Sequence, residues 1–189
     1  DQIEDNVWQA LEDLKTSGKV RSVGHSISLF DQTEGMARQW AAEDKIDVIQ
    51  VVYSLMNREA ESLIADLAAT GVGIVARESL ANGFLSGAFK HDTTFADGTI
   101  NARYSREEII ERVDIADAYK ALLVQGDVTG LAQAALRWVL ENQNVGLVLS
   151  GSRHLNEITD SAHASELAAF TADQMTAALK LHVKDYPPA

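Results

Sequence analysis

The chain has 189 residues, 46% of them hydrophobic, with a net charge of −12 and no cysteine. Its size and composition predict that residues 1–189 form one globular domain or a large part of one. The acidic charge argues against nucleic-acid binding, which needs a broad basic surface, and the lack of cysteine excludes disulfides and thiolate metal sites. We find no secretory signal and no apolar run long enough to span a membrane, so we expect a soluble, cytoplasmic protein.

The first part of the chain alternates between helical and extended patterns. Apolar residues at helical spacing alternate with short apolar runs of strand length. The predicted helices cover residues 1–14, about 31–41 and 59–69, and the predicted strands cover 20–23, 46–53 and 72–76. The regular alternation of strand and helix indicates parallel strands joined by crossover helices, which is an α/β fold.

The second part of the chain begins with a long loop. Residues 78–103 are rich in Gly, Asn, Asp and Thr, and a loop of this length in a compact domain is usually functional. Regular patterns then resume. The predicted helices are 105–124, 129–142, 156–164 and a C-terminal helix at about 172–184, and the fourth predicted strand is 145–149.

Four predicted strands are half the number that closes a (β/α)8 barrel. The outer strands of a four-stranded half would expose backbone and an apolar face, which proteins normally cover or pair. One interpretation is the C-terminal half of a TIM-type barrel that another segment or chain completes. The other is an open, doubly wound sheet, whose G-x-G-x-x-G fingerprint is not matched by residues 24–28.

Five segments, in chain order, resemble the aldo-keto reductase family. They are 11–24, 49–58, 80–87, 134–140 and 149–153. The resemblance covers nearly the whole chain and implies the second half of a barrel. It also implies an NAD(P)H-dependent oxidoreductase that reduces aldehydes or ketones to alcohols, with residues 78–103 as a loop close to the cofactor.

The resemblance implies that the nicotinamide lies across the carboxyl ends of the strands. Ser26 and Gln50 match residues that hydrogen-bond its carboxamide, while Ile27 replaces the usual Asn. Without the resemblance, Ser26 and Gln50 would be interpreted as a turn hydroxyl and a buried amide bonded to backbone. Arg77 replaces an aromatic residue that many members stack on the ring; it can stack there itself or pair with Glu78.

Two further segments match positions that contact the phosphates of the cofactor. The first approaches the pyrophosphate and comprises Leu80, Ala81, Asn82 and Gly83. In the second, Gly151, Ser152 and Arg153 precede a predicted helix, whose N-terminal amides and the Arg side chain can hold the 2′-phosphate of NADPH. Glu157 and Asp160 depart from the commoner family residues, and a carboxylate at Glu157 would repel phosphate. NADPH is therefore expected, with NADH as the alternative.

The tyrosine, lysine, aspartate and histidine that catalyse the family's reaction have no counterparts in this chain. None of its four tyrosines matches the catalytic one, so the chain by itself is expected to be inactive. His25, at the end of a predicted strand, can touch substrate or serve the structure. The other histidines show no metal-ligand spacing, and we predict no metal.

Two hypotheses about function follow. In the first, the chain is a fragment of a reductase, and its partners are a carbonyl substrate and the N-terminal half-barrel or another chain that carries the catalytic residues. In the second, it is a non-enzymatic half-barrel that binds a nucleotide or acts as a scaffold.

Overall fold

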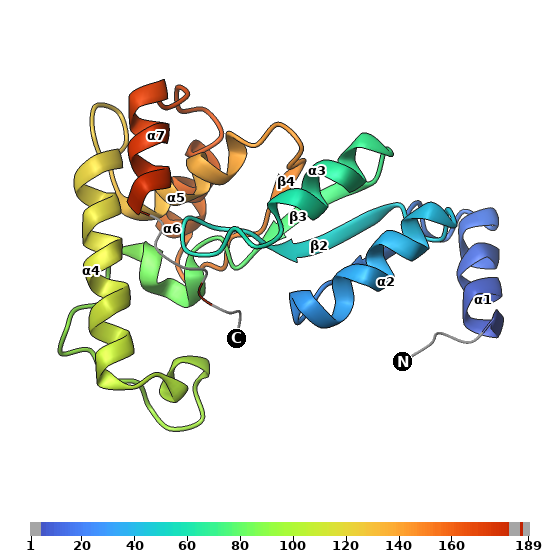
Figure 1. Cartoon of the computed structure of the whole chain (residues 1–189), viewed down its shortest axis with the longest axis horizontal. Helices are drawn as coiled ribbons and strands as arrows, with labels where there is room; N and C mark the ends of the chain where they lie inside the picture. Colours follow the sequence, from blue (N-terminus) through green and yellow to red (C-terminus); the bar gives the residue numbers. More distant parts are fainter. Residues whose placement is uncertain (1–4, 182–185, 187–189) are drawn as a thin grey trace.

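The computed structural model describes residues 5–181 and 186, which form a four-stranded parallel sheet with helices around it (Figure 1). The strands lie in the order β1-β2-β3-β4, and every neighbouring pair is parallel. They are β1 (Gly24–Ser26), β2 (Val48–Val52), β3 (Gly73–Arg77) and β4 (Leu147–Val148). The predicted α/β class and its parallel strands are confirmed.

Seven α-helices connect and flank these strands. They are α1 (Asp5–Thr16), α2 (Phe30–Ala42), α3 (Glu61–Ala69), α4 (Arg106–Leu123), α5 (Leu131–Leu140), α6 (Leu155–His163) and α7 (Ala172–Leu181). Figure 1 shows α1 and α2 at one end of the molecule and α4 to α7 gathered at the other. Each corresponds to a predicted helix, although residues 1–4 and 182–184 of those predictions lie outside the described residues. None of the helices described is long and apolar enough to cross a membrane.

The prediction of a strand at 20–23 is wrong, because β1 begins at Gly24. The amide of Val23 donates to the side-chain Oδ2 of Asp47 at 2.8 Å instead of to a neighbouring strand, and Lys15 Nζ lies 2.8 Å from the same oxygen. The nearby ammonium and amide lower the pKa of Asp47, so the carboxylate stays charged. A side chain therefore takes the place of a ladder partner before the strand starts.

The other strands are shifted or shortened by only a few residues. The fourth, predicted at 145–149, is two residues long. Its pairing with β3 nevertheless extends to the amides of Gly146 and Leu149, which donate to the carbonyls of Ile74 and Ala76 at 3.0 and 2.8 Å. The ends of a strand are difficult to predict from sequence, because pairing with a neighbouring strand decides where the strand begins and ends.

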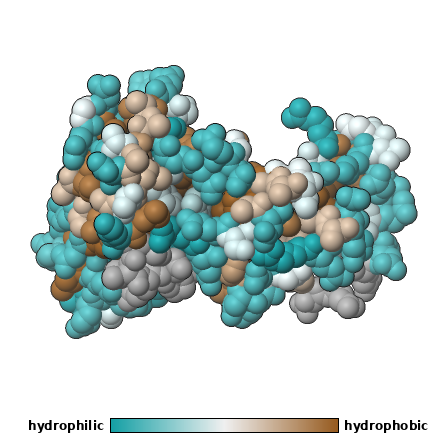
Figure 2. Space-filling model, turned by 45° about the horizontal axis from the view of Figure 1, so that its top comes forward, coloured by the Kyte–Doolittle hydropathy of each residue, from teal (hydrophilic) through white to brown (hydrophobic). Residues whose placement is uncertain are grey.

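The two faces of the sheet have different surroundings. On one face, Ile49 and Ala76 are fully buried in the main hydrophobic core, where α3 packs on β3 and α5 on β4. On the other face, Gln50 lies in register with Val75, and Val75 with Leu147, which is 48% exposed. Figure 2 shows apolar side chains that reach the surface and a hollow between the two ends of the molecule. Among the described residues, this second face carries no helix layer, although parallel sheets are normally covered on both faces.

The loop at 78–103 contains neither α-helix nor strand, but it is well packed. It includes two short 3-10 helices, η1 (Ala81–Ser86) and η2 (Ile100–Arg103). The ring of Phe84 is 2% exposed and meets the edges of Phe89 and Tyr104 at centroid distances of 5.2 and 5.5 Å. This aromatic cluster holds the loop against α4 and the end of the sheet.

We expect Gly24→Ala to lower the melting temperature by roughly 2–12 °C. An added Cβ at Gly24 would lie 2.6 Å from Val48 Cγ1 and 2.9 Å from the Val48 carbonyl, which forces β1 away from β2. Overpacking of this kind costs about 1–3 kcal/mol. Gly73→Ala is the control, because its nearest new contact is 3.5 Å away. Calorimetry of both variants checks this, and equal shifts would contradict it.

Candidate functional site

Ser26, the last residue of β1, lies beside Gln50 at the middle of β2. They are paired in register on the open face of the sheet, and Ser26 Oγ donates to Gln50 Oε1 at 3.2 Å. Ser26 is exposed and Gln50 is half-buried, so the amide is not buried and bonded to backbone as the structural interpretation supposed. The pair leaves a hydroxyl lone pair and an NH2 group, which complement the NH2 and carbonyl of a carboxamide.

Arg77 links the ends of β3 and β1. Its Nη2 donates to the carbonyl of Ile27 at 2.9 Å, and its Nη1 pairs with Glu78. Asn82 Nδ2 donates to the second oxygen of the same carboxylate at 3.3 Å. The ion pair considered for Arg77 is therefore present and neutralises the guanidinium. The side chain of Ile27 is 1% exposed and packs in the core, so it does not reach the open face.

The turn at residues 78–83 is held by its own backbone. Glu78, Ala81 and Asn82 adopt positive φ angles of 52°, 47° and 54°, a conformation that is costly for residues with a side chain. The amides of Ala81 and Gly83 donate to the carbonyls of Glu78 and Leu80 at 2.7 and 2.9 Å. The turn therefore already uses two of the amides that could bind a pyrophosphate.

Gly83 has a structural reason to lack a side chain. Its φ is +96°, and an added Cβ would lie 3.0 Å from the ring of Phe89. The resemblance implies that the segment containing this glycine approaches the pyrophosphate. In the structure its missing side chain makes room for the aromatic cluster.

The start of α6 is occupied by a side chain of the same helix. The carboxylate of Glu157 accepts hydrogen bonds from the amides of Arg153 and His154 at 2.7 and 3.1 Å. These two amides lower the pKa of Glu157, so it is ionised at neutral pH. The side chain of Arg153 is exposed, and Gly151 has no neighbour within 4 Å of an added Cβ.

The backbone carbonyl of Asp160 accepts a hydrogen bond from Gln133 Nε2 at 3.3 Å. This bond ties α6 to α5. Ser152, half-buried, lies in the connection between β4 and α6. Near it, the hydroxyls of Ser150 and Ser161 are 2.9 Å apart and join the end of β4 to the last part of α6. The structure thus brings Gly151, Ser152 and Arg153 together at one helix end, as their sequence order requires.

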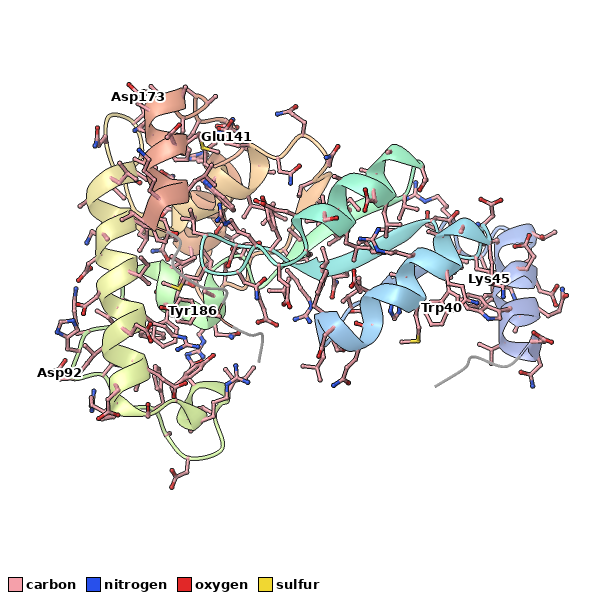
Figure 3. The ribbon with its side chains drawn as sticks, in the orientation of Figure 1. Trp40, Lys45, Asp92, Glu141, Asp173 and Tyr186 are labelled. Carbon is pink, nitrogen blue, oxygen red and sulfur yellow. The ribbon has the colours of Figure 1, made fainter. Side chains whose placement is uncertain are left out.

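His25 serves the packing of the helices. Its ring meets the ring of Trp40 at 4.7 Å, and Trp40 in turn meets Trp8 at 5.2 Å, between α2 and α1 (Figure 3). Burial lowers the pKa of His25. Since successive strand residues point to opposite faces, His25 faces away from Ser26. The structural interpretation of His25 is the one the geometry supports.

The tyrosines are engaged elsewhere in the fold. The hydroxyl of Tyr119 donates to the carbonyl of Leu55 at 2.9 Å, and that of Tyr53 donates to Glu61 at 3.1 Å. Burial raises the pKa of Tyr53, so its hydroxyl keeps its proton. Tyr104 and Tyr186 stack on the guanidinium of Arg112 at 4.2 and 4.3 Å.

Arg112 is a buried charged residue beside a small pocket that sequence reasoning did not single out. It is 4% exposed on α4 and lines a pocket with Asn57, Glu78 and Asn82, and with Tyr186, which Figure 3 shows beside α4. The sequence feature that could have identified Arg112 is its position on the apolar face of a predicted helix, beside Ile109 and Val113. Within residues 5–181 and 186, no group of three acidic, His or Cys residues could hold a metal ion.

Comparison with known proteins identifies relatives over nearly the whole chain. The sequence model of the aldo/keto reductase family matches residues 2–182. An NADH-specific methylglyoxal reductase of Escherichia coli is 24% identical over 86% of this chain and 49% of its own length. The uncharacterised oxidoreductase YrpG of Bacillus subtilis is 31% identical over 87% and 50%. The chain thus spans about half the length of the curated relatives it matches.

Solved structures agree on the fold. A glycerol dehydrogenase from Gluconobacter oxydans superposes with a TM-score of 0.78 at 22% identity, covering 99% of this chain and 59% of that one. An aldo-keto reductase from Bacillus halodurans in its holo form gives 0.70 at 23% identity, over 96% and 57%. With the family model matching from residue 2 to residue 182, the chain belongs to the aldo-keto reductase family.

Proposed function

We propose that this chain is the cofactor-binding half of a barrel that reduces aldehydes or ketones to alcohols with NAD(P)H. The observation that carries this proposal is the Ser26–Gln50 pair, which lies on the open sheet face at the carboxyl end of β1, with Gln50 at the middle of β2. Barrel enzymes place their chemistry at that end. We also propose a cytoplasmic location, supported by the absence of cysteine.

The remaining strands of the barrel are proposed to pack on the open face and to bring the catalytic residues. Leu147 and Leu149 are 48% and 43% exposed there, and covering them would bury apolar surface. Relatives about twice as long are consistent with a second half of this size. A non-enzymatic scaffold is less well supported, because the relatives that carry a named activity are mostly reductases.

The residues of this chain would hold the nicotinamide, which supplies the hydride when the cofactor is bound. Gln50 would donate to the carbonyl of the carboxamide, and Ser26 would accept from its NH2 group, which together select one orientation of the ring. Arg77, neutralised by Glu78, would border the ring without adding net charge. NADPH, expected from Arg153, and NADH both fit this arrangement; relatives with either cofactor in their names are known.

The test is to produce this chain and the other half of the barrel as separate polypeptides. Each half, and the two mixed, is assayed for oxidation of NADH and NADPH with small aldehydes, and light scattering reports association. We expect each half to be about 10²–10⁴-fold less active than the complete protein, since the acid that protonates the carbonyl is missing from this one. Mixing should restore activity. Full activity of this chain alone, or a complete protein that binds neither cofactor, would refute the proposal.

A further inference from the structure

The N-terminus of α6 lies where barrel proteins commonly bind a phosphate. Such sites are formed by the loops after the last two strands and the start of a short helix, because free backbone amides and the helix dipole attract an anion. Here β3 and β4 are the last two strands, and α6 is a helix of nine residues that follows β4. An incoming phosphate would meet the amides of Arg153 and His154.

These amides already have an anionic partner. The carboxylate of Glu157, at the third position of α6, accepts from both of them at 2.7 and 3.1 Å as in a capping box, so a phosphate oxygen would have to compete with it for these amides. Asp160 follows three residues later on the same helix, and residues 149–163 contain two carboxylates but only one arginine. A phosphate dianion would have to displace Glu157 and then lie close to its charge.

We propose that Glu157 is a specificity-determining residue that makes the protein prefer NADH by excluding the 2′-phosphate of NADPH. This inference rests on the proposed function. The two cofactors differ only by that phosphate, so the rest of the site holds both equally. A built-in carboxylate thus reverses the preference that Arg153 alone would give.

The test measures binding to the complete protein, not its activity. Titration calorimetry with NADH and NADPH, and with the fragments adenosine 5′-diphosphate and adenosine 2′,5′-bisphosphate, compares ligands with and without the 2′-phosphate. We expect NADH to bind about tenfold more tightly than NADPH, which corresponds to about 1.4 kcal/mol. Glu157→Gln should bring the two dissociation constants within about twofold by strengthening NADPH. Glu166→Gln, which removes an exposed carboxylate beyond α6, is the matched control and should change neither.

A second variant distinguishes the effect of the charge of Glu157 from the effect of losing its hydrogen bonds at the start of α6. Glu157→Asp keeps the carboxylate and should keep the preference for NADH, and thermal unfolding of each variant reports whether the fold is intact. Tighter binding of NADPH than of NADH by the unchanged protein would overturn this inference and leave the proposed function standing. Failure of both dinucleotides to bind would instead refute the proposed function.

Discussion

Replacing Gln50 by alanine is expected to lower the kcat of the complete protein by about 10- to 100-fold. The change removes the NH2 group proposed to hold the carboxamide and leaves Ser26 Oγ without the acceptor that lies 3.2 Å away. A nicotinamide that turns by even a small angle no longer points its reacting carbon at the substrate, and misplacement of about 1 Å can cost about 10²-fold. The affinity for cofactor should fall less, by about 2- to 10-fold, because one neutral hydrogen bond contributes little net free energy.

The control for this experiment is Gln39→Ala, which removes an exposed glutamine from α2. The side-chain amide of Gln39 donates to Glu43 one turn along the helix, at 2.8 Å, so its loss should leave kcat and cofactor affinity unchanged. Steady-state kinetics at saturating cofactor, with direct binding measurements, distinguish the two effects. If Gln50→Ala matches the control in both, the Ser26–Gln50 pair is not the nicotinamide site.

Phe84→Ala is expected to lower the free energy of unfolding by about 3–5 kcal/mol. The ring is 2% exposed and meets Phe89, Phe95 and Tyr104, while the guanidinium of Arg112 lies 5.7 Å from its centre. Its removal leaves a cavity that these rings cannot fill without releasing the loop at 78–103 from α4.

Urea denaturation of the purified protein measures this loss, with Ile100→Ala as the control in the same loop. Ile100 is 57% exposed, so its truncation should cost less than about 0.5 kcal/mol. Limited proteolysis should cut the Phe84→Ala variant within residues 78–103 first. A loss below about 1 kcal/mol would mean that the aromatic cluster does not hold the loop.

Much of the fold could be predicted from local patterns. Helix α4, predicted at 105–124, is the clearest example: it spans Arg106–Leu123, because helical periodicity is a property of residues that are neighbours in sequence. The strand at 20–23 was misplaced because Asp47, 24 residues beyond Val23, takes its amide. Gly24, His25 and Ser26 have low strand propensity, so the sequence did not indicate that β1 lies there.

Some residues of the candidate site could likewise be found from the sequence, and others could not. Ser26 and Gln50 were found by resemblance, and the parallel register of β1 and β2 brings them side by side. Gly83 was interpreted as part of a segment that approaches the pyrophosphate, and the structure adds a packing reason for a glycine there, because its φ is +96° and an added Cβ would lie 3.0 Å from Phe89. Arg112 was missed, because an arginine on an apolar helix face shows its stacking partners only when Tyr104 and Tyr186 are brought to it.

The sequence by itself determined the α/β class, the order of its elements and membership of the family, because periodicity and ordered motifs are properties of neighbouring residues. Only the tertiary structure decided how the charged groups are used. Arg77 donates to the carbonyl of Ile27, 50 residues earlier in the chain, and the carboxylate of Asp47 accepts from the amide of Val23. These outcomes depend on which donors and acceptors come within about 3 Å once the chain is folded, and hydrogen bonds act only over that distance.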